Sequence, residues 1–157
     1  MNIMAFDPGL SGAMAVINDH GILMEPFPVI GGFLNLSAIS AWASSNLTLD
    51  TRAYLEHVHA VYGSSAAGTF TFGRGMGSLE GLLTGLGISY ELVQPKTWQR
   101  EIHRGIEGKL TAKEKSRMAA ARLFPQYDFR ASEKCRKPHD GMIDAVLIAE
   151  YGKRVTK

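Results

Sequence analysis

Three short apolar runs open the chain, each bounded by turn residues, at positions 3–6, 13–17 and 22–25. Runs this short are typical of strands rather than helices. The first run ends on Asp7, after which Pro8 fixes its own φ angle and Gly9 permits a positive one, so the chain can reverse at once. The pattern predicts a three-stranded antiparallel meander with Asp7 at the rim of a sheet. On this stretch alone, an aspartate that only caps the turn is the alternative.

The middle of the chain predicts two more strands, at 52–58 and 88–93. The first of them carries Glu56 directly after an apolar run. If this strand lies parallel to the opening strand, Glu56 and Asp7 share one edge of the sheet. His57 and His59 flank Glu56 and could bind a metal, but alternation along a strand sends neighbouring side chains to the opposite face.

A helix is predicted between the opening meander and the strand at 52–58. Apolar residues recur at helical spacing from 36 to 47 around Trp42, with Ser37 as a candidate cap, and residues 29–32 are expected to form a connection. The fold class that follows is α/β. We expect a five-stranded mixed sheet, three antiparallel strands and then two parallel ones, flanked by helices.

Glycine, serine and alanine dominate residues 60–71, which predicts an exposed, mobile loop directly after Glu56. Three aromatic side chains here could stack on unpaired bases: Tyr62, Phe70 and Phe72. Phe72 could instead anchor the next helix. That helix is expected from Gly73, although each glycine in it costs about 1 kcal/mol relative to alanine. The glycines therefore indicate close approach of another backbone, either the sheet beneath or a partner helix.

The carboxy-terminal part of the chain is basic. Residues 1–95 carry a formal charge of −5 and residues 96–157 a charge of +7. This asymmetry favours nucleic acid as a partner over a merely solvated lysine-rich surface. A capping box at 111–114 predicts the start of an amphipathic helix. Lys113 and Arg117, four residues apart, share a face of that helix that could hold phosphates.

The last predicted helix carries two acids in an otherwise apolar stretch. Asp140 and Asp144 are four residues apart, hence on one face, where their charges repel. The pair is stable if the helix N-terminus and divalent cations compensate it, because Mg²⁺ prefers hard oxygen ligands. The alternative, two acids that cap the helix start, accounts for Asp140 but poorly for Asp144.

Composition narrows the class of protein. A chain of 157 residues with 45% hydrophobic and 20% charged residues is expected to form one domain over residues 1–157. Neither a run of 18 apolar residues nor a basic-then-apolar leader is present, so we expect a soluble, cytoplasmic protein without a membrane partner. The single cysteine, Cys135, excludes an internal disulfide and a cysteine-rich zinc site.

Four acids on three separated segments resemble the RuvC family of Holliday junction resolvases, within the ribonuclease H-like superfamily. The resemblance rests first on Asp7-Pro8-Gly9, Glu56, and Asp140 with Asp144. Four longer motifs are most similar to the phage-borne branch: Tyr54-Leu55-Glu56-His57-Val58-His59-Ala60, Phe70-Thr71-Phe72-Gly73-Arg74-Gly75, Val93-Gln94-Pro95-Lys96-Thr97-Trp98 and His139-Asp140-Gly141-Met142-Ile143-Asp144-Ala145-Val146-Leu147-Ile148-Ala149. The resemblance spans nearly the whole chain.

The resemblance implies a Mg²⁺-dependent crossover junction endodeoxyribonuclease of DNA recombination and repair. It would nick two opposed strands of a four-way junction, leaving 5′-phosphates, in the cytoplasm of a bacterium or a phage-infected host. The catalytic residues, which would hold two Mg²⁺ ions with Mn²⁺ able to substitute, would be Asp7, Glu56, Asp140 and Asp144. A homodimer would form through the glycine-rich helix. The residues that contact branched DNA would be Lys96, Lys109, Lys113, Arg117 and Phe70.

One position departs from the family pattern. Many bacterial members place the last two acids three apart, and that position is Gly141 in this chain. The third ligand is therefore expected to be Asp140. If the helix turns Asp140 outward, His139 or a water would complete the site.

Other functions stay open from the sequence. A broader endonuclease, acting on forks, flaps and three-way junctions in phage DNA processing, is the main alternative. Sugar kinase-like and actin-like ATPases also begin with an Asp-Gly hairpin, but they need a second half for which 157 residues leave little room. A non-catalytic junction-binding protein would have no use for the full set of acids.

Overall fold

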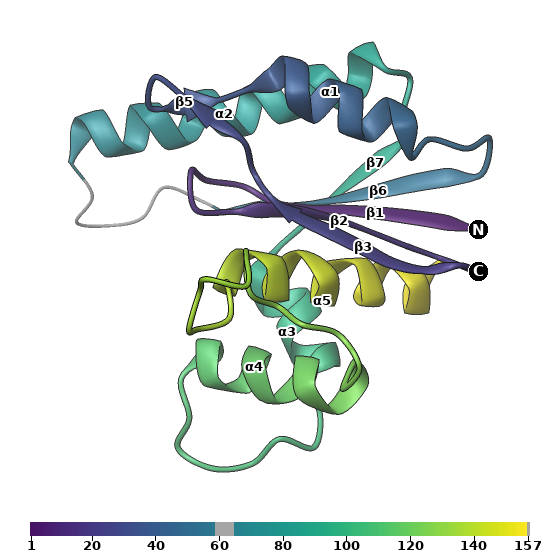
Figure 1. Cartoon of the computed structure of the whole chain (residues 1–157), viewed down its shortest axis with the longest axis vertical. Helices are drawn as coiled ribbons and strands as arrows, with labels where there is room; N and C mark the ends of the chain where they lie inside the picture. The colour runs from purple at the N-terminus through teal and green to yellow at the C-terminus, as the bar shows by residue number, and fades with distance from the viewer. Residues whose placement is uncertain (59–64, 157) are drawn as a thin grey trace.

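A five-stranded mixed sheet forms the centre of the protein in a computed structural model that describes residues 1–58 and 65–156 (Figure 1). The strands in spatial order are β3 (Gly21–Pro26), β2 (Ala13–Asn18), β1 (Asn2–Asp7), β6 (Thr51–Glu56) and β7 (Tyr90–Val93). The first three pair antiparallel, and β1, β6 and β7 pair parallel. The predicted sheet is confirmed, and the parallel pairing brings the carboxyl ends of β1, β6 and β7 to one edge.

Helices cover both faces of this sheet (Figure 1). The helices on one face are α1 (Leu36–Ser45) and α2 (Ala66–Gly85). On the other face, α5 (Asp140–Val155) lies directly against the strands. An outer pair packs on α5, namely α3 (Pro95–Ile102) and α4 (Ala112–Leu123). None of the helices in the described part of the chain is both long and apolar enough to cross a bilayer.

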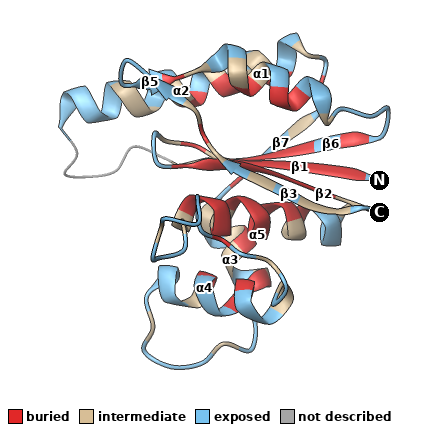
Figure 2. Ribbon diagram, in the orientation of Figure 1, coloured by how far each residue is buried: buried red, intermediate tan, exposed pale blue. Residues whose placement is uncertain are grey.

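Buried side chains line both sides of the sheet, as the red positions of Figure 2 show. Strand β1 supplies both cores, because alternate side chains of a strand point to opposite faces. Ile3 and Ala5 join the core beneath α5, and Met4 and Phe6 join the core beneath α1 and α2. The opening strand is therefore buried on both faces, which explains why its sequence is a continuous apolar run.

The chain between β3 and α1 differs from the prediction. Residues expected to form a plain connection make a small hairpin of β4 (Val29–Ile30) and β5 (Phe33–Leu34). Gly31 and Gly32 form its turn with positive φ angles of 58° and 78°, which glycine adopts without strain. The cap of α1 is Asn35, whose side chain accepts a hydrogen bond from the Ala38 N–H, and not Ser37.

Helix α2 begins earlier than predicted. Its cap is Ser65, whose hydroxyl accepts from the Gly68 N–H, so much of the expected loop is helical and Phe70 lies on the helix. The predicted helix was too short because residues 60–71 are rich in glycine, serine and alanine, a composition typical of loops. Burial of Met76 and Leu79 against the sheet stabilises the helix despite this composition. Two residues singled out in the sequence fall outside the described part of the chain: His59 and Tyr62.

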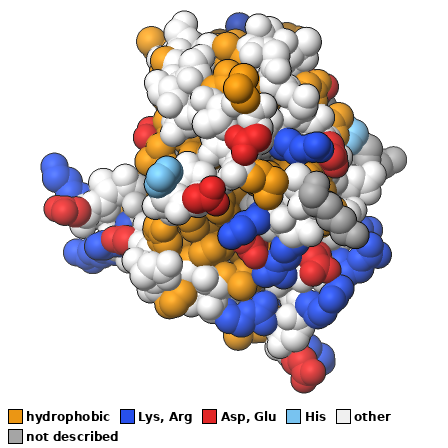
Figure 3. Space-filling model, turned by 90° about the vertical axis from the view of Figure 1, so that its right-hand side faces the viewer, with side chains coloured by type: hydrophobic (Ala, Val, Ile, Leu, Met, Phe, Trp, Pro, Cys, Tyr) orange, Lys and Arg blue, Asp and Glu red, His pale blue; other side chains and the backbone are white. Residues whose placement is uncertain are grey.

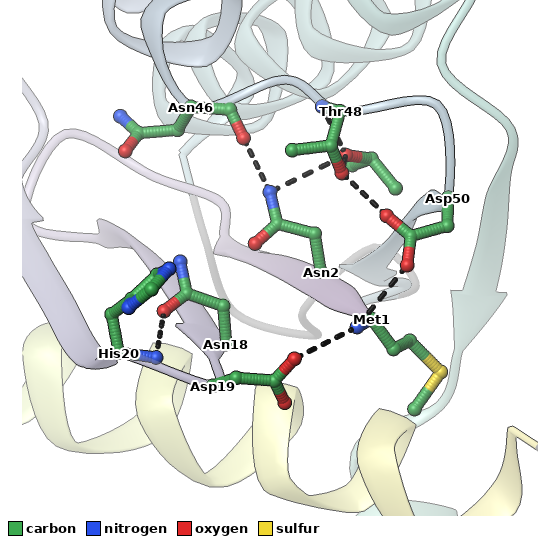
Figure 4. A network of polar contacts seen from close by, with 9 residues as sticks. Met1, Asn2, Asn18, Asp19, His20, Asn46, Thr48 and Asp50 are labelled. Carbon is green, nitrogen blue, oxygen red and sulfur yellow. Dashed lines mark hydrogen bonds and ion pairs between the residues drawn. The ribbon is translucent and has the colours of Figure 1, made fainter.

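The amino terminus is held at the edge of the sheet where β1 begins (Figure 4). The terminal ammonium of Met1 forms ion pairs with Asp19 at 3.5 Å and Asp50 at 3.1 Å. The Asn2 side-chain amide donates to the Asn46 carbonyl oxygen and to the Thr51 hydroxyl, the latter at 3.3 Å. These contacts hold the loop before β6 against the start of β1. They therefore support the parallel register of β1 and β6, which places Asp7 and Glu56 at the same end of the sheet.

Figure 3 views the end of the molecule that carries both termini. Lys and Arg side chains gather over the lower half of this face, interleaved with Asp and Glu. Arg154, near the end of α5, contacts Glu150 at 2.8 Å and Glu101 at 3.7 Å, and Arg104 contacts Glu101 at 2.8 Å. Part of the basic surplus is therefore neutralised at this end.

Candidate active site

Three carboxylates come together where the parallel strands end. Asp7 is the last residue of β1, Glu56 is the last residue of β6, and Asp144 projects from the second turn of α5. The groups lie close enough that the charges of Glu56 and Asp144 both raise the pKa of Asp7. The structure thus brings together three of the four acids singled out in the sequence, from segments far apart in the chain.

Burial makes these carboxylates unusually hard to ionise. Only 8% of Glu56 is exposed. Burial raises the pKa of Asp7 well above its ordinary value, and the nearby charges and a hydrogen bond with Glu56 raise it further. The pKa of Glu56 is raised by burial and partly lowered by a hydrogen bond from Trp98. Burial raises the pKa of Asp144 to about 6, partly offset by the Ser116 hydroxyl. Shifts of this kind, caused by burial and by neighbouring charges, are typical of functional sites.

Close packing of α5 on the turn after β1 brings Asp144 to Asp7. A Cβ atom at Gly141 would lie 2.6 Å from the Ser11 carbonyl oxygen and 2.9 Å from the Gly12 backbone. Any side chain at position 141 would therefore push the helix away from the turn. Glycine at position 141 therefore permits the close packing of α5 on this turn.

Asp140 points to cations instead of to the three carboxylates. Arg117 contacts its Oδ1 through Nε at 2.9 Å and Nη2 at 2.8 Å, and Lys113 Nζ lies 3.2 Å from Oδ2. Partial burial raises the pKa of Asp140, but these two cations outweigh it and hold the pKa below its ordinary value. The helix cap is His139, whose Nδ1 accepts from the Met142 N–H. A ligand role for Asp140 or His139 stays a prediction.

A cleft of about 590 Å³ opens beside Asp7 and Asp144, and Glu56 is not among the residues that line it. It is lined by the β1–β2 turn, the start of α5, Asp7, Lys113, Asp144 and Phe72. The sequence analysis singled out Phe70 for stacking, but Phe70 is 69% exposed on α2 and does not line the cleft. Phe72 forms the wall instead, because a helix turns residues two apart to different sides.

The two remaining residues predicted to contact DNA lie outside the cleft. Lys96 is exposed in the first turn of α3, directly after β7, and Lys109 is exposed in the loop between α3 and α4. This loop extends past α4, away from the sheet (Figure 1). Sequence reasoning missed Trp98, whose Nε1–H donates to Glu56 Oε1 at 2.8 Å. Its place in the quoted Lys96-Thr97-Trp98 motif was the available signal.

The donor set fits a hard divalent cation. Asp144 Oδ1 is buried without a hydrogen-bond partner among the described residues, and a cation would satisfy it. Carboxylate oxygens are the ligands that Mg²⁺ and Mn²⁺ prefer. As the side chains stand, no three His, Cys, Asp or Glu of residues 1–58 and 65–156 form a complete ligand group.

Comparison with known proteins finds the fold among solved structures. No protein-family model matches the chain, and no curated protein matches it. RuvC of T. thermophilus in complex with Holliday junction substrate is similar, with a TM-score of 0.64, 12% identity and coverage of 98% of this chain and 95% of that one. A Thermus thermophilus RuvC structure has a TM-score of 0.58 and 15% identity, covering 98% and 96%.

These similarities define the class of fold. The five-stranded mixed sheet with flanking helices is the ribonuclease H-like architecture. Within that architecture the similarity to RuvC extends over almost the full length of both chains, so the fold is RuvC-like.

Proposed function

We propose that the protein is a structure-selective DNA endonuclease that resolves four-way (Holliday) junctions by paired metal-dependent nicks, leaving 5′-phosphates. The observation that carries the proposal is the convergence of Asp7, Glu56 and Asp144 beside the basic helix α4. The structural neighbour bound to a Holliday junction supports the choice of substrate. In this proposal the chain acts as one domain in the cytoplasm of a bacterium or a phage-infected cell. The same proposal includes its membership of the phage-borne branch of the RuvC family.

Asp7, Glu56 and Asp144 hold the divalent cations in this proposal, with Asp140 joining them when it leaves Arg117. Two Mg²⁺ ions held by these residues would supply an activated water and would stabilise the charge on the phosphate and the leaving oxygen. The chain itself orients the carboxylates through the ends of β1 and β6 and the first turns of α5. Burial keeps bulk water away from Glu56 and strengthens electrostatic interactions at the edge of the sheet.

Four exposed cations bind the phosphate backbone in this proposal. Lys113 lines the cleft and Arg117 contacts Asp140. Lys96 follows β7, and Lys109 lies in the loop between α3 and α4, farther from the cleft. Because Lys113 and Arg117 already contact Asp140, a DNA phosphate competes with Asp140 for the same two groups. Binding of DNA therefore frees Asp140 at the moment when the cut strand arrives.

Two opposed cuts require two active sites and hence two copies of the chain. The exposed glycines of α2 are a surface along which the two copies could meet. Gly73, Gly77, Gly81 and Gly85 recur every four residues, and a Cβ at any of them would meet nothing within 4 Å. The glycines are thus not there for packing on the sheet. We propose that a second copy of the chain approaches along them, which allows close contact between backbones. Phe70 and Gly77 are seven residues apart on α2, so Phe70 lies along the same side and near the partner.

The test is a nicking assay on labelled four-way junctions. Asp7→Asn and Glu56→Gln should keep junction affinity within threefold of the wild type and lower the Mg²⁺-dependent nicking rate at least a hundredfold, since each removes a cation ligand. Asp19→Asn, an exposed acid at the opposite edge, is the matched control and should nick normally. Normal cutting by either site variant would refute the proposal. Forks, flaps, three-way junctions and linear duplex in the same assay separate a junction resolvase from the broader endonuclease.

A further inference from the structure

Trp98 connects helix α3 to the candidate site through one hydrogen bond. Its side chain has no exposed surface, and its Nε1–H donates to Glu56 Oε1 at 2.8 Å. The acceptor is itself one of the three clustered carboxylates. A buried carboxylate that accepts a hydrogen bond has fewer accessible rotamers, and outer partners of this kind orient metal ligands in proteins.

The contacts of Trp98 continue toward Asp144. The Trp98 ring meets the His103 ring edge to face, with 5.7 Å between centroids. His103 Nε2 lies 3.2 Å from the hydroxyl of Ser116, which is only 3% exposed and stands beside Asp144. Helices α3 and α4 thus form a layer behind two of the three carboxylates.

The second tryptophan of the chain, Trp42, shows by comparison which features of Trp98 packing alone can explain. Trp42 is also buried, on α1 at the opposite face of the sheet, and its Nε1–H has no partner among the described residues. In this protein a tryptophan can therefore fill a core without a hydrogen-bond acceptor. Packing accounts for the Trp98 ring, but it does not account for an N–H aimed at Glu56.

We propose that Trp98 is a positioning residue that fixes Glu56 in the orientation needed to bind a divalent cation. The inference rests on the proposed role of Glu56 in metal binding. The indole holds Glu56 through Oε1, beside the hydrogen bond that joins Glu56 to Asp7. Without the N–H, Glu56 would lose one of these two restraints, and part of the binding free energy of the cation would be spent on ordering it.

Two matched substitutions test this role without using cleavage as the readout. Trp98→Phe and Trp42→Phe each replace a buried indole by a smaller ring, but only the first removes a hydrogen bond to Glu56. In calorimetric titrations with MnCl₂ and no DNA, we expect Trp98→Phe to bind Mn²⁺ at least tenfold more weakly than Trp42→Phe, which should match the wild type. Junction affinity in EDTA should be equal in both variants. Equal Mn²⁺ affinity in the two variants would overturn the proposal.

A spectroscopic measurement covers the case in which Trp98→Phe does not fold. The chain has two tryptophans, so its ¹H–¹⁵N spectrum has two indole signals, which the Trp42→Phe variant assigns. We expect the Trp98 signal to shift in Glu56→Gln and on addition of MgCl₂, while the Trp42 signal stays in place. An unmoved Trp98 signal in Glu56→Gln rules the positioning role out. If the signals behave as expected but the wild type cuts no branched DNA, the proposed function fails and the positioning role stands.

Discussion

At the scale of the residue, the site is defined by carboxyl groups that resist ionisation. Burial raises the pKa of Asp7, Glu56 and Asp144, the last to about 6. A carboxyl group whose pKa is higher in the folded than in the unfolded chain binds its proton more tightly when folded. The stability that the group contributes is therefore lost as the pH rises from the pKa of the unfolded state, near 4, through the higher pKa of the folded state.

Replacement of Asp144 should therefore stabilise the metal-free protein at neutral pH. We expect Asp144→Asn to raise the free energy of unfolding by about 1 to 3 kcal/mol at pH 7.5, since it removes a group ionised against its environment. The gain should vanish at about pH 3, below the pKa of Asp144 in both the folded and the unfolded state. Urea unfolding in EDTA at the two pH values measures the difference, and MgCl₂ at pH 7.5 should stabilise only the wild type. A gain of equal size at both pH values would contradict the electrostatic account.

At the scale of the element, helix α2 is divided between two roles. Met76, Leu79 and Leu83 bury one side against the sheet, while the glycine side faces open space. Glycines at exposed helix positions lower helix stability by about 1 kcal/mol each. In the proposed homodimer, contact with the second copy of the chain would offset this cost.

Alanine substitutions on the two sides of α2 should differ in their effect on assembly, because only the one on the glycine side should weaken self-association. Gly77→Ala should stabilise the monomer by up to about 1 kcal/mol through helix propensity and weaken self-association at least tenfold, because the added methyl groups separate the two backbones. Gly75→Ala is the control, since its methyl would meet Leu34 of the same chain at an ordinary 3.5 Å. Sedimentation equilibrium measures both. Dimers of unchanged affinity in Gly77→Ala would remove the glycine side from the interface.

At the scale of the whole molecule, charge is distributed unequally between the two ends of the sheet. At the end with both termini, Arg104 and Arg154 are paired with acids of the same face. At the site, Lys113 and Arg117 form ion pairs only with Asp140 within the described part of the chain. In the proposed function, these are the cations that DNA would recruit.

Junction binding should reflect this difference through its salt dependence. In EDTA, log affinity should fall linearly with log salt, and Arg117→Gln should reduce the slope by about one, because one phosphate contact is lost. Arg104→Gln, at the other end, should leave the slope unchanged. Fluorescence anisotropy with a labelled four-way junction from 50 to 200 mM NaCl gives both slopes. An equal slope for Arg117→Gln and the wild type would exclude Arg117 from the phosphate contacts.

The sequence by itself determined the local elements of this protein. The strands around Asp7 and Glu56, the capping box at Thr111 and Glu114, and the last helix with Asp144 depend on short-range periodicity and turn chemistry. These elements need no information from distant parts of the chain. The meeting of Asp7 and Glu56 was expected on the condition that their strands pair in parallel, and the structure confirms that pairing.

Only the tertiary structure decided what surrounds those acids. The hydrogen bond from Trp98 to Glu56 joins residues 42 apart in the chain, and the contact of Gly141 with the Ser11 carbonyl joins residues 130 positions apart. The turn of Asp140 toward Arg117 and the choice of Phe72 over Phe70 as the cleft wall depend in the same way on where helices dock. Contacts of this kind arise from packing and charge compensation between distant segments, and such pairings leave no periodic trace in the sequence.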